Sequence, residues 1–345
     1  MTAKNVSQIY SQNRSVLSEA LPLDTPFLVS ISLVNYCNLA CRFCYHSDHE
    51  EKRRRGIMPS MLEYSEYVKI IDDCKRFPNK LKALRLSAWG EPLLHPDYIK
   101  MLKYANNAEV AGRIEIFTNA VLLTREISDG LIKYGMNKMI ISIEALSDEG
   151  YYEICGRHID FPDLIDNLKY LYENKSDTLI MHIKIADMGL RGKDDTERFF
   201  QIFGDICDEI SVDHIVPIPV ESAARAILAN MKNENLDKTK GWDKIADRKV
   251  CPFIFTSLLI QHDMRVLQCN RDIWCEESLG DVRTQSLSDI WNGDKHTNLC
   301  LSHLKQSRYS VEFCRDCSTI LYTSNDNIDD CADVILNRYG KNRGL

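Results

Sequence analysis

The sequence feature that most constrains the fold is a regular alternation between short apolar segments and longer segments with helical periodicity. The apolar segments are rich in β-branched residues and have the length of buried strands. Such a repeat predicts parallel strands joined by right-handed crossover helices. We expect strands at 27–34, 83–89, 113–118, 138–143, 178–186 and 209–216, and helices at 59–75, 96–106, 125–134, 147–154, 164–172 and 194–207.

Polar or conformationally special residues follow the ends of five of these predicted strands. Parallel sheets bind ligands outside the carboxyl ends of their strands, so these residues should face one mouth. In strand order they are Cys37, Cys41 and Cys44; Gly90, Glu91 and Pro92; Thr118 and Asn119; Ser142 and Glu144; and Lys184. Thr118-Asn119 equally fits an ordinary turn, because an asparagine side chain readily bonds its own backbone.

The three cysteines after the first strand form a C-x3-C-x2-C pattern. Three thiolates on one loop can converge on a metal centre, yet they are one ligand short of the four of an ordinary [4Fe-4S] cluster or structural zinc. The missing ligand leaves a coordination position open, which indicates chemistry. A zinc loop and three unrelated cysteines are the alternatives.

With Phe43 directly before Cys44, the triad resembles the cluster motif of the radical S-adenosylmethionine (SAM) enzymes. The resemblance covers about residues 27–218. It implies an α/β fold with a partial (β/α)6 TIM-type barrel, and a [4Fe-4S] cluster on the three cysteines. It also implies that SAM is cleaved to a 5′-deoxyadenosyl radical, which takes a hydrogen atom from a substrate. An electron donor such as flavodoxin or ferredoxin would be the partner.

The same resemblance implies which residues contact SAM. Gly90-Glu91-Pro92 matches the motif that receives the SAM amino group, where glycine lets backbone approach the ligand closely. Ser142 resembles the first residue of a Ser-x-Asp motif, with Glu144 in place of the aspartate. Arg157 resembles an arginine that pairs with the SAM carboxylate, or is a surface arginine.

His182 and Lys184 lie two residues apart in the fifth predicted strand, so they share a face. If this face lines the barrel lumen, both are candidates for substrate contact or proton transfer. If it is the outer face, neither has a catalytic meaning.

A second group of cysteines lies near the C-terminus. Cys251 and Cys269 bracket a predicted hairpin, and Cys314 and Cys317 form a C-x2-C turn, which together make a complete four-thiolate site. A zinc ribbon fits this spacing. However, Gly280-Asp-Val and residues 286–291 resemble the SPASM and twitch extensions of radical SAM enzymes, which implies one auxiliary [4Fe-4S] cluster.

Cys275, six residues beyond Cys269, has three interpretations. It is a hydrogen-atom donor to a substrate radical, a replacement cluster ligand, or an ordinary buried cysteine.

Composition supports a cytoplasmic metalloprotein. Thirteen cysteines in a chain with no signal or membrane segment point to metal use rather than disulfides. The net charge of -7 lacks the excess of positive charge that is typical of nucleic-acid-binding proteins. We expect an N-terminal helical extension at 1–26, the barrel at 27–218, a linker at 219–249 and a small cysteine-rich auxiliary-cluster domain at 250–345.

These features favour a radical SAM oxidoreductase of dehydrogenase type that acts on a small hydroxylated or amino-sugar-like molecule. The auxiliary cluster would accept the electron that an oxidised substrate radical loses. An epimerase, a modifying enzyme of a ribosomally made peptide, and a non-catalytic iron–sulfur carrier or zinc-binding protein are the alternatives. The sequence leaves the substrate itself open, because lumen residues vary on a shared fold.

Overall fold

The computed structural model describes residues 2–6, 15–213, 247–270, 272–315, 317, 320 and 326–343. Its strands form a ten-stranded sheet in the order β1-β7-β6-β5-β4-β3-β2-β8-β9-β10. The six predicted parallel strands are β2 (Leu28–Ile31), β3 (Ala83–Arg85), β4 (Ile114–Thr118), β5 (Lys138–Ile143), β6 (Ile180–Ala186) and β7 (Glu209–Asp213). Each pairs in parallel with its sequence neighbour, which confirms the predicted order.

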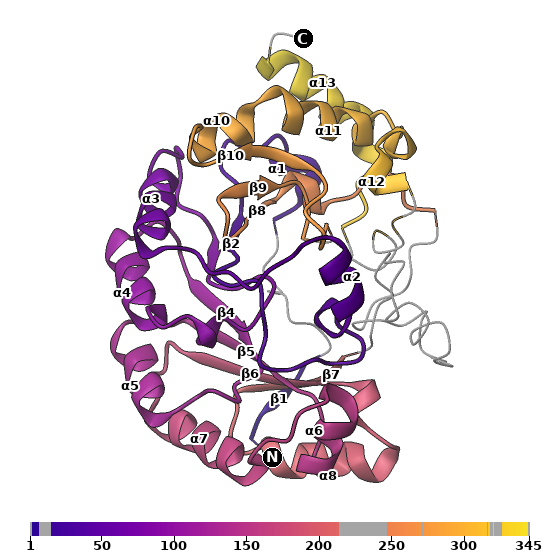
Figure 1. Ribbon diagram of the computed structural model, residues 1–345. Helices are drawn as coiled ribbons and strands as arrows, with labels where there is room; N and C mark the ends of the chain where they lie inside the picture. The colour runs from indigo at the N-terminus through magenta and orange to yellow at the C-terminus, as the bar shows by residue number, and fades with distance from the viewer. Residues whose placement is uncertain are drawn as a thin grey trace.

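Helices cover the outer side of the curved sheet, and the strands lie inside this arc (Figure 1). The result is the expected partial barrel, with the cysteine-rich C-terminal region added at one edge. The helices between the barrel strands are α2 (His49–Arg54), α3 (Tyr64–Cys74), α4 (Tyr98–Ala108), α5 (Arg125–Lys133), α6 (Asp148–Cys155), α7 (Phe161–Asn174) and α8 (Lys193–Phe203).

Strand β6 shows how side-chain alternation separates the two faces of the sheet. Met181, Ile183 and Ile185 are fully buried and belong to the main hydrophobic core, which the helices share. His182 and Lys184 alternate with them and therefore lie on the opposite, inner face. Both residues thus belong to the face that lines the lumen.

The C-terminal region continues the barrel sheet. Strand β8 (Ser257–Ile260) pairs in parallel with β2, and β9 (Arg265–Leu267) forms an antiparallel hairpin with β8. The hairpin confirms the prediction, whereas its pairing with β2 was not foreseen. The rest of the region contains β10 (Ser278–Asp281), α10 (Leu287–Asn292), α11 (Asp294–Leu304), α12 (Glu312–Arg315) and α13 (Ala332–Arg343).

The N-terminal segment differs from the expected helical extension. Its described residues contain β1 (Lys4–Asn5), which pairs in parallel with β7, and the short helix α1 (Leu17–Ala20). Most of the predicted linker, 219–246, lies outside the described residues, as do 214–218 at the expected end of the barrel.

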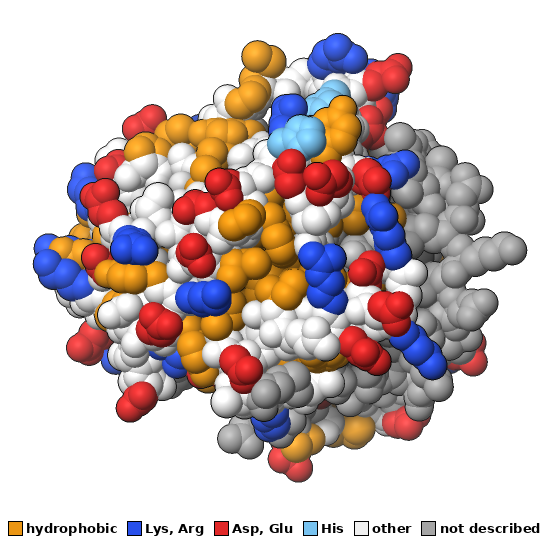
Figure 2. Space-filling view, turned by 90° about the horizontal axis from the view of Figure 1, so that it is seen from below, with side chains coloured by type: hydrophobic (Ala, Val, Ile, Leu, Met, Phe, Trp, Pro, Cys, Tyr) orange, Lys and Arg blue, Asp and Glu red, His pale blue; other side chains and the backbone are white. Residues whose placement is uncertain are grey.

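The described helices include none with the length and apolar character needed to cross a membrane. On the face shown in Figure 2, acidic and basic side chains are interspersed around a strip of hydrophobic ones. No large area of this face carries side chains of one charge only.

Candidate cluster and SAM site

The loop after β2 carries the three cysteines and is anchored on the end of helix α6. The backbone N–H of Ala40 donates to the carbonyl of Cys155 at 3.0 Å, and that of Arg42 donates to the carbonyl of Ile154 at 2.9 Å. The last carbonyls of a helix have no partner within the helix, so they are free to hold such a loop. The loop therefore has a fixed position at the carboxyl edge of the sheet.

The thiols on this loop are shielded from water. Burial raises the pKa of Cys37 to about 12 and that of Cys44 to about 11. A hydrogen bond with Cys155, followed by burial, raises the pKa of Cys41 well above its usual value; the two sulfurs lie 3.4 Å apart. The three cysteines, if ionised, would also repel one another, because Cys44 raises the pKa of both Cys37 and Cys41.

This environment fits a metal cluster as the partner of the three cysteines. Buried thiolates are costly unless a positive centre compensates them, and cluster iron does so. Among the described residues, no three His, Cys, Asp or Glu side chains converge as closely as a metal ion requires. In the structure Cys41 contacts Cys155 instead. We assign the cluster to Cys37, Cys41 and Cys44 on the chemistry of this donor set, with Phe43 packed beside them against the core.

Gly90-Glu91-Pro92 forms a tight turn that packs against the cysteine loop. Gly90 has φ +83°, and a Cβ there would lie 2.6 Å from the carbonyl oxygens of Tyr36 and Val34. Only glycine tolerates both conditions. The backbone N–H of Glu91 donates to the carbonyl of Tyr36 at 2.9 Å, and Pro92 begins a short 3₁₀ helix. The motif thus sits directly against the loop that carries Cys37.

The Glu91 side chain is buried and connects this turn to the end of β4. It accepts hydrogen bonds from the Thr118 hydroxyl at 2.6 Å, the Asn119 backbone N–H at 2.8 Å and the Leu93 backbone N–H at 3.1 Å. Burial raises the pKa of Glu91 to about 7, and these three donors act against the rise. Glu91 therefore has a structural role, while the SAM contact assigned to the motif would come from its backbone.

Asn119 extends the connection to the cysteine loop. Its side-chain nitrogen lies 2.8 Å from Asn38 Oδ1 and 3.6 Å from the Cys37 sulfur, and its Oδ1 accepts from the Val121 N–H at 3.0 Å. The turn interpretation is thus correct for Oδ1, and the amide also faces the cluster loop. No local sequence pattern predicts the contact to Cys37, because Asn119 and Cys37 are 82 residues apart.

The two residues predicted after β5 differ in their surroundings. Ser142 is half-buried on the inner face of β5, opposite Lys184 on β6. Glu144 is buried, and burial raises its pKa to about 7 while Lys184 opposes the rise. Its carboxylate in turn raises the pKa of Cys37, Cys41 and Cys44. Glu144 therefore lies within electrostatic reach of both the cluster loop and the lumen.

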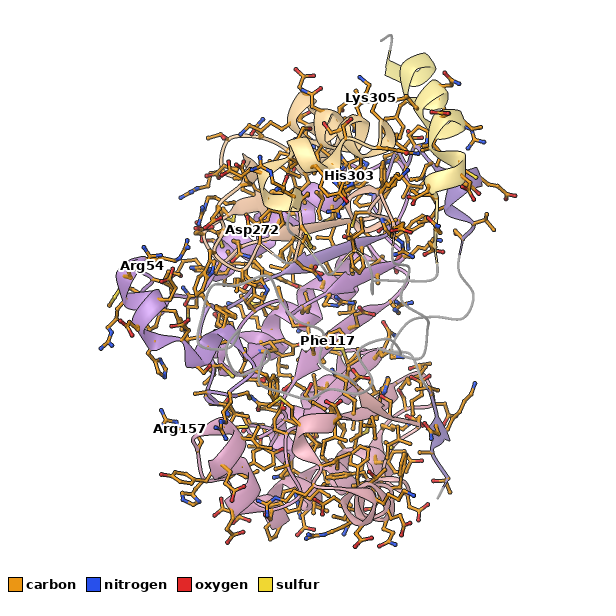
Figure 3. All side chains as sticks on the ribbon, turned by 90° about the vertical axis from the view of Figure 1, so that its right-hand side faces the viewer. Arg54, Phe117, Arg157, Asp272, His303 and Lys305 are labelled. Atoms are coloured by element: carbon orange, nitrogen blue, oxygen red, sulfur yellow. The ribbon has the colours of Figure 1, made fainter. Side chains whose placement is uncertain are left out.

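Arg157 stands apart from this group. It is exposed, one residue beyond the left-handed cap Gly156 that ends α6, and Figure 3 shows it at the periphery. The structure leaves its guanidinium facing solvent, so its predicted contact with the SAM carboxylate stays a prediction.

The inner face of β6 and β7 carries paired polar groups. Lys184 Nζ donates to Asp213 Oδ2 at 3.0 Å, and Ser211 Oγ lies 3.3 Å from Asp213 Oδ1. His182 is fully buried one step further from the carboxyl edge, with Nε2 2.9 Å from Ser211 Oγ. Burial lowers the pKa of His182 to about 4, so its ring is neutral at ordinary pH. Lys184 thus faces the mouth, and His182 lies beneath it.

The structure brings Cys251, Cys314 and Cys317 within electrostatic reach of one another, and Cys269 within reach of Cys314, while the four-thiolate site stays a prediction. Burial raises the pKa of Cys251 and Cys314 to about 12, and Cys317 adds to both shifts by repulsion. Cys269 acts on Cys314 in the same way. Two shielded thiols with two further cysteines in electrostatic reach fit a fully protein-ligated centre, and we propose these four residues as its ligands. Nearby, His303 accepts a hydrogen bond from the Cys251 backbone N–H at 3.2 Å (Figure 3).

Cys275 does not belong to either group of cysteines. It has φ +56°, its carbonyl accepts from Arg265 Nη1 at 3.0 Å, and it lines a pocket with Tyr45, the residue after Cys44. This position beside Tyr45 is consistent with the expectation that Cys275 lies near the barrel mouth.

Two residues near the site were missed by sequence reasoning. Cys155 is fully buried in the core, and it also contacts Cys41. Asp213 falls within the strand predicted at 209–216. A charged residue at the carboxyl end of a predicted inner strand was the available signal for Asp213, whereas no local pattern links Cys155 to Cys41.

Family comparisons agree with this geometry. Residues 31–200 match the model of the radical SAM superfamily, and residues 251–318 match that of an iron–sulfur cluster-binding domain, SPASM. The tungsten-containing aldehyde ferredoxin oxidoreductase cofactor-modifying protein of Pyrococcus furiosus is 21% identical over 350 residues, which cover 89% of this chain and 94% of that protein. GTP 3′,8-cyclase of Clostridium perfringens is 27% identical over 124 residues, 36% of each chain.

Solved structures share the fold. The chain resembles BtrN in complex with AdoMet and 2-DOIA, with a TM-score of 0.54, 16% identity, and coverage of 88% of this chain and 97% of that one. It also resembles Streptococcus suis SuiB bound to S-adenosylmethionine, with a TM-score of 0.60, 15% identity, and coverage of 82% and 69%. At these identities the likeness establishes the architecture and leaves the substrate open.

Proposed function

Because the chain belongs to the radical SAM superfamily and carries a SPASM-type iron–sulfur cluster-binding domain, we propose that it is a dehydrogenase-type enzyme acting on a small hydroxylated or amino-sugar-like molecule. Its cofactors are SAM, the SAM-binding [4Fe-4S] cluster and an auxiliary iron–sulfur cluster. Bound SAM supplies a 5′-deoxyadenosyl radical on reductive cleavage, and the auxiliary cluster supplies an acceptor for the electron that leaves the oxidised substrate.

The observation that carries the proposal is the Lys184–Asp213 pair at the carboxyl edge of the inner face. Its nitrogen and oxygen lie 3.0 Å apart, and Lys184 also acts on Glu144. Two carboxylates around one ammonium group suit a substrate that has hydroxyl or amino groups. Glu144 acts in turn on the thiols of the cluster loop, so this polar patch adjoins the place where we assign SAM.

The pair also suits the proton transfer that dehydrogenation needs. Oxidising a C–H and O–H pair to a carbonyl removes one hydrogen atom, one proton and one electron. Asp213 favours the ammonium form of Lys184, so we assign Lys184 as the donor that holds the substrate oxygen and Asp213 as the acceptor of the hydroxyl proton. His182 lies deeper and holds Ser211, so we give it a supporting role.

Epimerisation is the second candidate, and the position of Cys275 favours it. The residue lines a pocket together with Tyr45 of the cluster loop, and a thiol there is suited to return a hydrogen atom to a substrate radical. The reaction then ends without net oxidation. Modification of a peptide remains the third candidate, and SuiB bound to precursor peptide SuiA shares the fold.

The test uses protein reconstituted with iron and sulfide under anaerobic conditions, then given SAM, dithionite and candidate polyols or amino sugars in deuterated water. Dehydrogenation predicts one 5′-deoxyadenosine for each carbonyl product and no solvent deuterium at the reacting carbon. Deuterium at that carbon, in a product isomeric with the substrate, would overturn dehydrogenation in favour of epimerisation.

A further inference from the structure

A pocket of about 460 Å³ lies beside the cluster loop; it includes Cys275, but none of the residues assigned above to SAM or to proton transfer in dehydrogenation. Its walls come from the loop after Cys44, the segment after α2, the end of β3 and the β8–β9 turn. The residues that matter for its chemistry are Tyr45, Trp89, Trp274, Gln261, His262 and Arg265. Its volume is in the range of small-molecule sites.

The protonation of His262 follows from its neighbour Asn35. The Asn35 amide is oriented by backbone contacts, because its Oδ1 accepts from the Ser60 N–H at 2.7 Å and its Nδ2 donates to the Met58 carbonyl at 2.9 Å. The same Nδ2 lies 3.2 Å from His262 Nε2. An amide nitrogen only donates, so Nε2 is the acceptor and a neutral His262 carries its proton on Nδ1.

That Nδ1–H has no hydrogen-bond partner within the described residues, although the atom is buried. The neighbouring Gln261 is 1% exposed, and its side-chain nitrogen likewise lacks a partner there. Buried polar groups without partners are costly, and they mark places where a ligand or water completes the bonding. Two adjacent residues with such groups line this one pocket.

The charged groups of the pocket are already paired. Arg265 binds Asp263 through Nε at 2.8 Å, and Arg55 binds Glu276 at 2.8 Å while stacking 4.8 Å from the centre of the Trp274 ring. Each guanidinium therefore has its own carboxylate, and the pocket offers no surplus positive charge to an anion. Among the described residues that line the pocket, the groups that lack partners are the two hydrogen-bond donors, His262 Nδ1–H and the Gln261 side-chain amide.

The walls present flat aromatic surfaces. Tyr45 packs edge-on against Trp274 with ring centres 5.7 Å apart, and against Trp89 at 6.3 Å. Aromatic walls of this kind bury planar, apolar faces favourably. A ligand that satisfies both walls and donors must therefore be flat and must carry an acceptor oxygen on its edge.

We propose that this pocket binds a neutral, planar ring compound with a carbonyl group on its edge, such as a cyclic or aromatic amide. The carbonyl oxygen accepts from His262 Nδ1–H, and the Gln261 amide bonds the adjacent edge. The ring packs against the wall that Tyr45, Trp89 and Trp274 form together. This inference is independent of the proposed dehydrogenation, and it competes with the epimerisation candidate for one pocket, because Cys275 also lines it.

The test is titration of the reconstituted full-length protein by calorimetry and tryptophan fluorescence. The probes are two neutral amides, nicotinamide and uracil, and their matched anions, nicotinate and orotate. We expect at least one neutral probe to bind and to quench tryptophan emission, and its anion to bind more weakly. Failure of both neutral probes to bind, or equal binding of an anion, would overturn the proposal.

Variants locate the binding. His262→Phe removes the donor and is expected to weaken the neutral probe about tenfold, the value of one hydrogen bond of about 1.4 kcal/mol. Gln261→Leu should have a similar effect. His158→Phe is the matched control, because His158 is exposed and pairs with Asp148 far along the chain from the pocket residues. Thermal unfolding and iron content report whether each variant is intact. Unchanged affinity in an intact His262→Phe protein contradicts the proposal.

Discussion

The sulfur of Cys155, at the end of α6, lies 3.4 Å from the sulfur of Cys41, although 114 residues separate them. The helix that carries Cys155 also holds the cysteine loop through two backbone hydrogen bonds. Once Cys41 is a thiolate on iron, Cys155 is the partner that must donate its proton to the contact. Hydrogen bonds to cluster sulfurs raise reduction potentials.

Replacing Cys155 by alanine should therefore lower the potential of the SAM-binding cluster. The substitution also removes buried volume, at a cost of about 1 to 2 kcal/mol in stability. Cys207→Ala is the control, because Cys207 is equally buried but bonds the Phe203 carbonyl. We expect both variants to lose stability, and only Cys155→Ala to shift the potential measured by redox titration with electron paramagnetic resonance. Identical shifts in both would refute a specific role.

Gly90→Ala should abolish SAM cleavage. The added Cβ would meet two backbone oxygens at 2.6 Å, and φ is +83°. Both effects push the turn away from the cysteine loop. Gly56→Ala provides the matched control, since Gly56 has φ +66° but open space around its Cβ position, and costs only about 1 kcal/mol of backbone strain. Assays of 5′-deoxyadenosine and of thermal stability distinguish the two; full activity in Gly90→Ala contradicts the assigned role.

The contribution of Glu91 and Glu144 to stability should fall as pH rises from about 4.5 to about 7, whereas His46, His182 and His303, whose pKa values burial lowers, contribute in the opposite direction. The pKa values of Glu91 and Glu144 are both raised to about 7, chiefly by burial, against an ordinary value of 4.5. At these two carboxyls the folded state binds more protons than the unfolded state in this window, so their contribution to stability is lost as the pH rises, completely above about pH 7. Thermal unfolding at several pH values should show Glu144→Gln gaining stability relative to the wild type as the pH rises through this window. An unchanged slope would count against the raised pKa of Glu144.

Lys184→Met should uncouple SAM cleavage from product formation. The variant keeps the shape of the side chain but loses the group that we assign to the substrate oxygen. We expect 5′-deoxyadenosine to form while the carbonyl product falls by about 100-fold or more, the usual range for proton-transfer groups. Lys184→Arg keeps the charge beside Asp213 and should retain more product. Equal product yield in Lys184→Met and the wild type would remove Lys184 from the mechanism.

The sequence supplied the strand order and the cysteine sets because both have local signatures. The apolar segments of β4 and β5 and the spacing of Cys37, Cys41 and Cys44 are visible in short windows. Contacts set by tertiary packing are not. Two such contacts are the pairing of β8 with β2 and the contact of Cys155 with Cys41. Both depend on how segments far apart in the sequence pack together, which side-chain periodicity does not predict.

The roles of polar residues follow the same division. Alternation placed His182 and Lys184 on one face correctly, yet only the structure shows that His182 is buried behind Ser211 while Lys184 reaches Asp213. Likewise, Glu91 belongs to a recognisable motif, but its three hydrogen-bond donors come from residues on two separate turns.

The most direct test compares the wild type with a variant in which Cys37, Cys41 and Cys44 are all alanine. After anaerobic reconstitution, both receive SAM and dithionite, and 5′-deoxyadenosine and iron are measured. The account predicts 5′-deoxyadenosine from the wild type alone, with the variant still holding the iron of one cluster on Cys251, Cys269, Cys314 and Cys317. Formation of 5′-deoxyadenosine by the variant, or none by a fully loaded wild type, would contradict it.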